Sequence, residues 1–384
     1  MSGYFLSEEE LLLKNTVRDF ADNEIAPRAA GYDESGDFPY DNFKGLGQLG
    51  LLGMTIDEEY GGSGGTFRQL AIAVEEIARA CAATSTSYIA HLSLCAQFIN
   101  MWGTEGQKRQ FLPALASGEH IGAFALTEPG SGSDAGAMRT LAKRSNGSYL
   151  LNGSKTFITN APEASVFVVL ASHDLSLKTR GINALIMEGD SEGLSVNPLK
   201  GKMGMRASSI AEVVFEDCAV SEENRMGAEG EGFRETMHVL NSSRISIAAQ
   251  CVGIAQAAYE AAVSHVKQRE AFGGKLAELQ AIQWMIADMA TQIDAARLLV
   301  MRVASMRDEG MEYVKEASMA KLFASRVAVE AADKSVQMHG GSGYLAPTPA
   351  ERYYRDAKVT EIYEGTSEIQ RLVIARSILR DGLV

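Results

Sequence analysis

Sustained helical periodicity in the C-terminal part of the chain constrains its fold most strongly. Apolar residues recur at helical spacing over residues 234–267, 276–307 and 313–338, and again in a shorter stretch that begins near residue 367. Helices of about thirty residues are long for isolated surface helices and are typical of bundles. We therefore expect residues 231–384 to form a four-helix bundle.

The residues before this bundle divide into two further parts. Residues 1–120 show amphipathic helices, the first of them opened by a capping box of Ser7 and Glu10. Near residue 121 the pattern changes to short apolar runs, and Asn146–Gly147 and Asn152–Gly153 predict two-residue hairpin turns. The predicted strands cover residues 121–126, 155–159, 166–170, 182–187 and 210–215. The expected fold class is α+β, with an N-terminal α-helical domain (1–120), a middle antiparallel β-barrel domain (121–230) and the C-terminal bundle (231–384).

Composition excludes several classes of function. The 384 residues are 46% hydrophobic and carry a net charge of −13, which argues against nucleic acid or an anionic membrane surface as a partner. No apolar run reaches the length of about eighteen residues that a membrane helix needs, and the acidic start MSGYFLSEEE is unlike a signal peptide. We expect a cytoplasmic protein, although a trimmed mitochondrial matrix protein would have the same features. Its four cysteines lack paired spacing, so we expect buried free thiols and no metal site.

The strongest candidate for chemistry lies near the C-terminus. Glu364 precedes Gly365 on a turn, and Ser367 with Gln370 forms the pattern of a capping box, which predicts a helix that starts at Ser367 and ends at Gly382. A carboxylate held away from water is a good general base. The same pattern also fits a solvated acid favoured by the helix dipole, so the local sequence leaves both interpretations open.

Two motifs in the predicted β domain supply groups that would suit a flat polar ligand. The segment 126–134 offers hydroxyls, glycines and free backbone N–H groups, but it departs from the Rossmann fingerprint. In the segment 155–160, Phe157 and Thr159 are two apart and would point to one face of a strand. An ordinary loop and an ordinary cross-strand aromatic residue are the alternatives.

Two further motifs lie in the bundle. The segment 269–273 offers an arginine for phosphate and a glycine turn, and the segment 337–344 is rich in glycine. By themselves they are equally typical of a helix cap and a tight turn. His91 lies in an apolar helix, where it lines a pocket or, more often, is a satisfied core residue.

These motifs together resemble the acyl-CoA dehydrogenases over essentially the whole chain. YEGTSEIQRLVIAR is similar to the C-terminal signature of that family, in which the glutamate matching Glu364 is the catalytic base, and the motifs at 126–134, 155–160, 269–273 and 337–344 have counterparts there. The resemblance implies the α, β, α domain plan and FAD as cofactor. It also implies that Glu364 takes the α proton of an acyl-CoA thioester while FAD N5 accepts the β hydride, which yields a 2,3-enoyl-CoA.

The resemblance also assigns binding residues. Those that match substrate contacts are Ser133, Arg244, Tyr363 and Gly365. Those that match cofactor contacts are Phe124, Leu126, Thr127, Ser133, Phe157, Thr159, Arg269, Phe272, Gln280, Gln337, Gly340, Gly341, Thr366 and Glu368. In the family the motifs at 269–273 and 337–344 act partly on a neighbouring subunit, so the resemblance implies a homotetramer. It also implies an electron-transfer flavoprotein as the electron acceptor.

Several alternatives stay open at this point. An acyl-CoA oxidase would share the site, and a non-catalytic helical binding protein would share the fold. Ser243 matches the position at which the isovaleryl and long-chain branches carry their base, so Glu364 has no rival from that helix. The acyl group is undecided between short, branched, cyclic and dicarboxylic chains, because residues 88–95 resemble branched-chain members and the C-terminal signature resembles short-chain ones.

Overall fold

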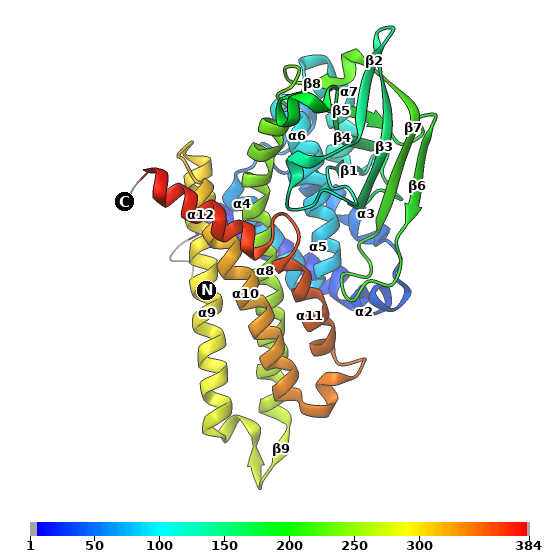
Figure 1. Cartoon of the computed structure of the whole chain (residues 1–384). Helices are drawn as coiled ribbons and strands as arrows, with labels where there is room; N and C mark the ends of the chain where they lie inside the picture. Colours follow the sequence, from blue (N-terminus) through cyan, green and yellow to red (C-terminus); the bar gives the residue numbers. More distant parts are fainter. Residues whose placement is uncertain (1–5, 382–384) are drawn as a thin grey trace.

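The computed structural model describes residues 6–381, in which helices flank a β domain on both sides in sequence (Figure 1). The N-terminal part is helical, and the Ser7–Glu10 capping box is present with both of its hydrogen bonds. Two further capping boxes, Thr66–Gln69 and Thr104–Gln107, open the helices that begin at Phe67 and at Glu105. The elements are α1 (Glu8–Phe20), η1 (Ala21–Ile25), α2 (Ala26–Ser35), α3 (Tyr40–Gln48), α4 (Phe67–Ala80), α5 (Ala82–Ile89), η4 (Ala90–Ala96), α6 (Gln97–Trp102) and α7 (Glu105–Ser117).

The middle part is one sheet in the order β6-β7-β3-β2-β4-β5-β8, with β1 added beside β4. Most pairs are antiparallel, as expected, but β1 and β2 both run parallel to β4, so the sheet is mixed. The strands are β1 (Gly122–Ala125), β2 (Leu141–Ser145), β3 (Ser148–Thr159), β4 (Val166–Ser172), β5 (Ile182–Glu188), β6 (Leu194–Pro198), β7 (Ile210–Ser221) and β8 (Arg225–Met226).

The two predicted hairpin turns have different outcomes. Asn146 and Gly147 do form the turn between β2 and β3. The turn expected at Asn152–Gly153 is wrong, because both residues lie inside β3, where the pairing with β7 shifts register between Leu151 and Gly153. A β-bulge places the glycine, which has φ 145°, within a continuing strand. Because β3 pairs with β7 both before and after the bulge, the chain stays extended there.

The C-terminal part is the expected helical bundle. It contains α8 (Gly232–Gln268), α9 (Gln280–Asp308), α10 (Val314–His339) and α12 (Ser367–Asp381). A small hairpin of β9 (Glu270–Ala271) and β10 (Gly274–Lys275) joins α8 to α9 at the far end of the bundle (Figure 1). The additional helix α11 (Pro349–Lys358) was not among the predicted helices. The predicted helix stop at Gly382 lies outside the described residues.

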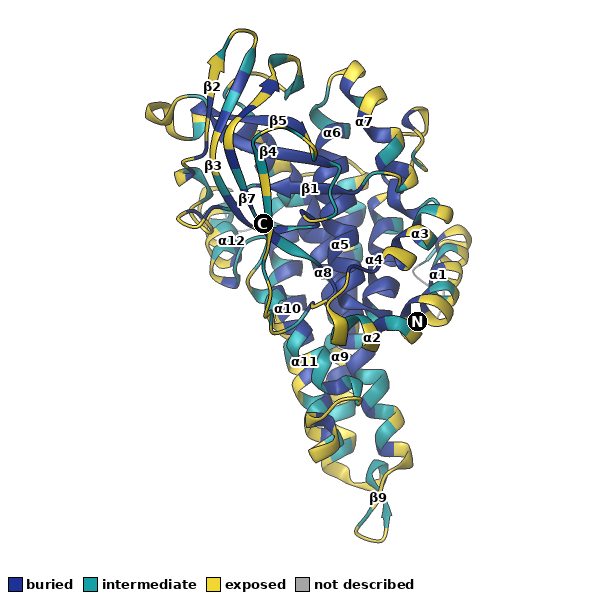
Figure 2. Cartoon of the chain, turned by 90° about the vertical axis from the view of Figure 1, so that its right-hand side faces the viewer, coloured by how far each residue is buried: buried dark blue, intermediate teal, exposed yellow. Residues whose placement is uncertain are grey.

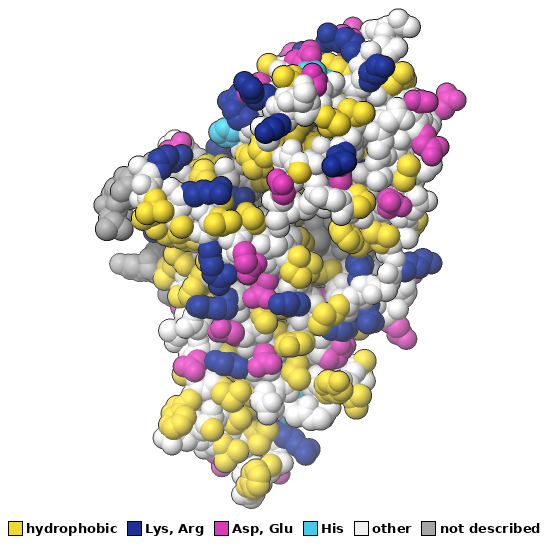
Figure 3. Space-filling model, viewed as in Figure 1, with side chains coloured by type: hydrophobic (Ala, Val, Ile, Leu, Met, Phe, Trp, Pro, Cys, Tyr) yellow, Lys and Arg dark blue, Asp and Glu magenta, His cyan; other side chains and the backbone are white. Residues whose placement is uncertain are grey.

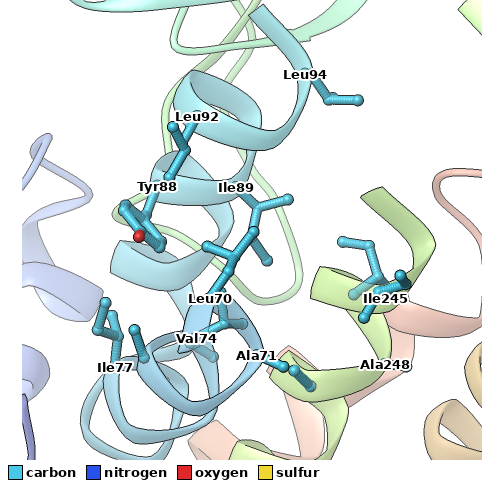
Figure 4. Close-up of a cluster of buried hydrophobic side chains, with 14 of the residues drawn as sticks. Leu70, Ala71, Val74, Ile77, Tyr88, Ile89, Leu92, Leu94, Ile245 and Ala248 are labelled. Atoms are coloured by element: carbon cyan, nitrogen blue, oxygen red, sulfur yellow. The ribbon is translucent and has the colours of Figure 1, made fainter. Parts of the chain in front are cut away.

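One hydrophobic core joins the N-terminal helices to the bundle. Leu70 and Val74 on α4, Ile89 on α5 and Ile245 on α8 are nearly inaccessible to solvent and belong to one cluster (Figure 4). Helices α4 and α8 approach so closely that a Cβ atom on Gly253 would lie 2.3 Å from the Glu75 carbonyl oxygen. Burial is greatest in this central region and decreases toward the β9 end of the bundle (Figure 2).

The structure also shows the state of the cysteines. The four cysteines are all buried and free. Among residues 6–381, none of the helices combines the length and hydropathy that crossing a bilayer requires. No cluster of His, Cys, Asp or Glu side chains in that range is arranged to hold a metal ion.

Candidate active site

The turn before α12 has an unusual backbone conformation that two buried side chains hold in place. Glu364 and Gly365 both have positive φ, 51° and 95°. Lys321 Nζ on α10 donates to the Gly365 carbonyl oxygen at 2.8 Å, and Gln370 Nε2 donates to the same oxygen at 2.8 Å. A Cβ atom on Gly365 would lie 2.6 Å from Gln370 Nε2, so only glycine fits there without displacing the amide.

The helix that follows starts at Ser367, as predicted, but its cap differs from the prediction. Thr366 Oγ1 accepts the hydrogen bond from the Ile369 backbone N–H at 3.3 Å, and so Thr366 caps the helix. The expected box between Ser367 and Gln370 is wrong. The Gln370 amide instead turns back to the carbonyl oxygens of the strained turn, where it finds buried acceptors.

The Glu364 carboxyl group is placed in an environment that suits a base. The Ser243 hydroxyl on α8 donates a hydrogen bond to Glu364 Oε2. Desolvation raises the pKa of Glu364 to about 7, while the positive charges of Lys321 and Arg244 oppose the increase. A carboxyl group with a pKa near the working pH is suited to accept a proton from carbon.

Arg244 is the neighbouring cation on α8. It is 6% exposed, and its Nη1 donates to Asn241 Oδ1 at 2.6 Å. Its Nε has no partner among the described residues, and its Nη2 lies 3.8 Å from the position of a Cβ on Gly365. The structure therefore brings Arg244 to the turn at Glu364 and Gly365 with a buried N–H group still able to donate.

Tyr363 is fixed by a network that sequence analysis missed. Its hydroxyl donates to Gln250 Oε1, and Gln250 Nε2 donates to Thr86 Oγ1 at 2.8 Å and to the Ala82 carbonyl oxygen at 3.1 Å. Burial raises the pKa of Tyr363 well above its ordinary value, so the phenol stays neutral. A glutamine within the apolar run of α8 was the available signal for this network.

Helix α5, which carries Ala82 and Thr86, connects this network to the end of β3. Asn160 Nδ2 donates to the Ser87 carbonyl oxygen at 2.9 Å, and Ser87 follows Thr86 in the chain. The turn at Glu364 and the motif at 155–160 are therefore both linked to one short helix. Two segments that are about two hundred positions apart in sequence are brought together in this way.

A buried ion pair fixes the loop that follows β1. Lys155 Nζ donates to Glu128 Oε1 at 2.7 Å and to the Leu126 carbonyl oxygen at 3.0 Å, and the ammonium group is inaccessible to solvent. The Glu128 carboxylate also accepts from the backbone N–H groups of Arg139 and Thr140, at 2.6 and 3.0 Å. Neither Lys155 nor Glu128 was singled out from the sequence as a site residue.

Phe157 projects from a bulge rather than from a regular strand. The pairing of β3 with β7 shifts register between Lys155 and Ile158, and Phe157 has φ 58°. Its ring is consequently 65% exposed. The strand is therefore irregular at Phe157, and the expectation that Phe157 and Thr159 share a face stays a prediction.

The groups around Phe157 fit a flat polar ligand such as a flavin. The hydroxyls of Thr127, Ser133 and Thr159 make no hydrogen bond to any residue in the range 6–381. Leu126 is partly exposed beside them, and the Thr156 N–H donates to the Thr127 carbonyl oxygen at 2.8 Å, which attaches the loop to β3. Exposed aromatic surface and hydroxyls that are free to donate are the two kinds of group that a flat polar heterocycle needs. Phe124 differs, since its ring packs in the core with its centroid 5.9 Å from that of Phe98.

The motifs at 269–273 and 337–344 lie far from Glu364. The rings of His265 and His339 have centroids 4.3 Å apart, which brings the two motifs together at the far end of the bundle. Along α8, the 26 residues from Ser243 to Arg269 span about 39 Å at 1.5 Å per residue. Residues assigned to the cofactor at this end are exposed: Arg269, Phe272, Gln280, Gln337, Gly340 and Gly341.

The remaining candidates are placed as follows. Glu368 is exposed on α12 and faces Arg371 at 3.6 Å. His91 is a satisfied core residue, because its Nδ1 accepts from the Gly122 N–H and its Nε2 donates to the Leu115 carbonyl oxygen, both at 3.1 Å. Burial lowers the pKa of His91 to about 4, so the ring is neutral.

Comparison with known proteins covers nearly all of the chain. Family models for the N-terminal, middle and C-terminal domains of acyl-CoA dehydrogenase match residues 7–119, 123–218 and 230–379. A relative from Clostridium acetobutylicum, a short-chain specific acyl-CoA dehydrogenase, is 47% identical over 98% of this chain and 99% of its own.

Two solved structures show the same similarity in three dimensions. The butyryl-CoA dehydrogenase of Megasphaera elsdenii is 41% identical with a TM-score of 0.96, over 98% of this chain and all of the other. A chain from the structure of the electron transferring flavoprotein of Acidaminococcus fermentans is 44% identical with a TM-score of 0.97, and the match covers 98% of this chain and 100% of that one.

Proposed function

The chain belongs to the acyl-CoA dehydrogenase family of FAD-dependent oxidoreductases, and from this premise we propose that it desaturates a short acyl-CoA with Glu364 as its base. The observation that carries the assignment of the base is the environment of Glu364. Its carboxylate is desolvated, is oriented by the Ser243 hydroxyl and has a pKa of about 7. We also propose three domains: the N-terminal helical domain (1–120), the middle β domain (121–230) and the C-terminal bundle (231–384).

Glu364 would remove the proton from the α carbon of the thioester. As that bond breaks, negative charge develops on the thioester carbonyl oxygen and must be stabilised. The Glu364 N–H donates to no group among residues 6–381, and Arg244 Nε nearby is equally free. These groups are the available donors for substrate oxygen atoms. Tyr363 and Gly365 would complete the substrate side of the turn.

When bound, FAD supplies the acceptor for the hydride that leaves the β carbon. Phe157, Thr159, Leu126, Thr127 and Ser133 would hold the ring system, an assignment supported by the exposed Phe157 ring and by the hydrogen bond that attaches the Thr127 loop to β3 next to it. The Lys155–Glu128 pair fixes the backbone of that loop. Thr366 and Glu368, at the start of α12, would also contact the cofactor, as the family resemblance implies.

The far end of the bundle would complete the cofactor site of a neighbouring subunit. Arg269 is about 39 Å from Ser243 along α8, a separation too large for both ends to serve one cofactor within a subunit. Hydrophobic side chains gather near this end (Figure 3), where Phe272 is 94% exposed, Tyr344 80% and Trp284 62%. Exposed apolar surface of this kind is typical of an interface between subunits. We therefore propose a homotetramer in which this end contacts a partner.

A short, straight acyl chain is the proposed substrate. The Clostridium relative is named as short-chain specific and the Megasphaera one as acting on butyryl-CoA. Residues 88–95 resemble branched-chain enzymes, but two of their side chains are used within the core. Tyr88 donates to the Leu51 carbonyl oxygen at 2.9 Å, and His91 accepts from the Gly122 N–H. We therefore prefer a short, straight chain to a branched one.

We propose an electron-transfer flavoprotein as the electron acceptor, supported by the similarity to the Acidaminococcus structure. We also propose a cytoplasmic location, because the Clostridium relative is bacterial.

Replacement of Glu364 by Gln tests the proposal. The variant should purify as a yellow, folded protein whose kcat with butyryl-CoA and a dye acceptor is lower by roughly 10²–10⁴-fold, the usual contribution of a general base. The matched control is Glu24→Gln, an exposed acid near the N-terminus that pairs with Arg28 and has no assigned contact with substrate or cofactor, which should retain most of its activity. Substantial turnover by Glu364→Gln would contradict the assignment. Peroxide formation without added acceptor would support an oxidase instead.

A further inference from the structure

We propose that Lys321 is a positioning residue for Glu364, holding the catalytic turn by its carbonyl oxygen and keeping the carboxyl group ionised by its charge. This inference rests on the proposed role of Glu364. Lys321 lies on α10, 43 positions before the base, and its side chain is inaccessible to solvent. Lysine is rarely buried completely without a specific partner.

The geometry gives Lys321 one partner on the catalytic turn. Its Nζ donates to the Gly365 carbonyl oxygen at 2.8 Å, and that peptide belongs to the turn with positive φ at both Glu364 and Gly365. A non-glycine residue in this conformation is strained, so the surrounding structure must hold it there. Gln370 Nε2 donates to the same oxygen at 2.8 Å. The turn is therefore held by two donors, of which only one is charged.

The charge of Lys321 acts on Glu364 together with two other groups. From α8, Arg244 contributes a positive charge and Ser243 a hydrogen bond, and from the same turn Tyr363 is neutral. Lys321 itself faces Cys251, Glu364, Arg244 and Glu361. Burial lowers the pKa of Lys321 to about 8, so at neutral pH it is still mostly protonated. Its positive charge favours the carboxylate form of Glu364, the form that accepts a proton.

Two substitutions separate the charge from the hydrogen bond. Lys321→Met removes both, whereas Gln370→Met removes the neutral donor to the same oxygen and leaves the charge. We expect Lys321→Met to move the acidic limb of the pH profile of kcat upward by roughly one pH unit. Gln370→Met should lower kcat at all pH values without moving the midpoint. Lys321→Gln, which keeps an N–H donor without the charge, serves if the Met variant fails to fold.

A second readout does not depend on turnover. The carboxylic acid C=O stretch of Glu364 can be followed in infrared difference spectra during a pH titration. Glu235 and Asp356 also have raised pKa values, about 7 and about 6, so the band is assigned by subtracting the matching spectra of Glu364→Gln proteins. We expect the midpoint of this band to rise in both Lys321 variants and to stay unchanged in Gln370→Met.

The outcomes are distinct from those that test the proposed function. Equal midpoints in the wild type and the Lys321 variants would overturn the inference, as would equal shifts in Lys321→Met and Gln370→Met, because either result makes Lys321 purely structural. If Glu364→Gln retained turnover, the proposed base would be wrong, yet the infrared titration would still report whether Lys321 controls the ionisation of Glu364.

Discussion

The Ser243 hydroxyl on α8 donates a hydrogen bond to the carboxylate of Glu364, a residue 121 positions further along the chain. The contact joins the longest helix of the bundle to the turn before α12. It stabilises the charged form of the carboxyl group, in opposition to the desolvation that raises its pKa to about 7. The basicity of Glu364 is therefore set by residues on two different helices, α8 and α10.

Replacement of Ser243 by Ala should raise the pKa of Glu364 further. Hydrogen bonds to charged groups contribute about 1.5–3 kcal/mol, and about 1.4 kcal/mol corresponds to one pH unit, so the acidic limb of the kcat profile should move upward by about one unit. Ser242→Ala is the control, because the Ser242 hydroxyl pairs with the Tyr313 hydroxyl at 2.8 Å and does not contact Glu364. An unchanged acidic limb in Ser243→Ala would mean that the hydrogen bond has no effect on the base.

Lys155→Met should destabilise the β domain strongly. The substitution leaves the buried Glu128 carboxylate without its cation, which typically costs about 3–5 kcal/mol. Urea denaturation followed by circular dichroism measures the loss. The control is Lys275→Met, which breaks the exposed pair between Lys275 and Glu270 and should leave stability nearly unchanged. Similar stability of both variants would show that the Lys155–Glu128 pair does not hold the loop.

Stability should decrease in mild acid because of His91. Its pKa is about 4 in the folded protein against 6.5 in an unfolded chain. Between these values the unfolded chain binds a proton that the folded protein does not, so the free energy of unfolding falls as the pH decreases from about 6.5 to about 4, by up to about 3 kcal/mol.

His91→Gln removes this titration and serves as the comparison. Asp356, whose pKa is raised to about 6 by burial, acts in the opposite direction but is present in both proteins. The difference in unfolding free energy between wild type and variant, measured in urea at several pH values, isolates His91. A difference that is constant with pH would refute the assignment of a neutral, buried ring.

Mixed oligomers test whether the far end of the bundle serves a partner. Glu364→Gln and Arg269→Ala should each be nearly inactive as pure proteins. When the two are unfolded, mixed and refolded together, some sites should combine an intact Glu364 with an intact Arg269 of the partner subunit. Activity should then reappear, up to half of the wild-type value per dimer. Absence of any recovery in verified mixed oligomers would place both residues in the site of one subunit.

The sequence predicted the fold well where patterns are local. The helices of the bundle follow from apolar periodicity, and the Ser7–Glu10 cap is present as predicted. Errors arose where distant pairing overrides a local signal. Asn152–Gly153 has the composition of a turn, but pairing to β7 keeps it inside β3. Ser367 and Gln370 have the spacing of a capping box, but the Gln370 amide bonds the carbonyl oxygens of the preceding turn instead.

By itself, the sequence determined the order of domains, the family and the position of Glu364, because these depend on motifs that are contiguous in the chain. Only the tertiary structure decided what surrounds that carboxyl group. Ser243, Lys321 and Gln250 carry no local signal of a shared role, since hydroxyl, ammonium and amide groups are common on helices. Their effect arises from burial beside one turn, where low polarity and short distances make each contact strong.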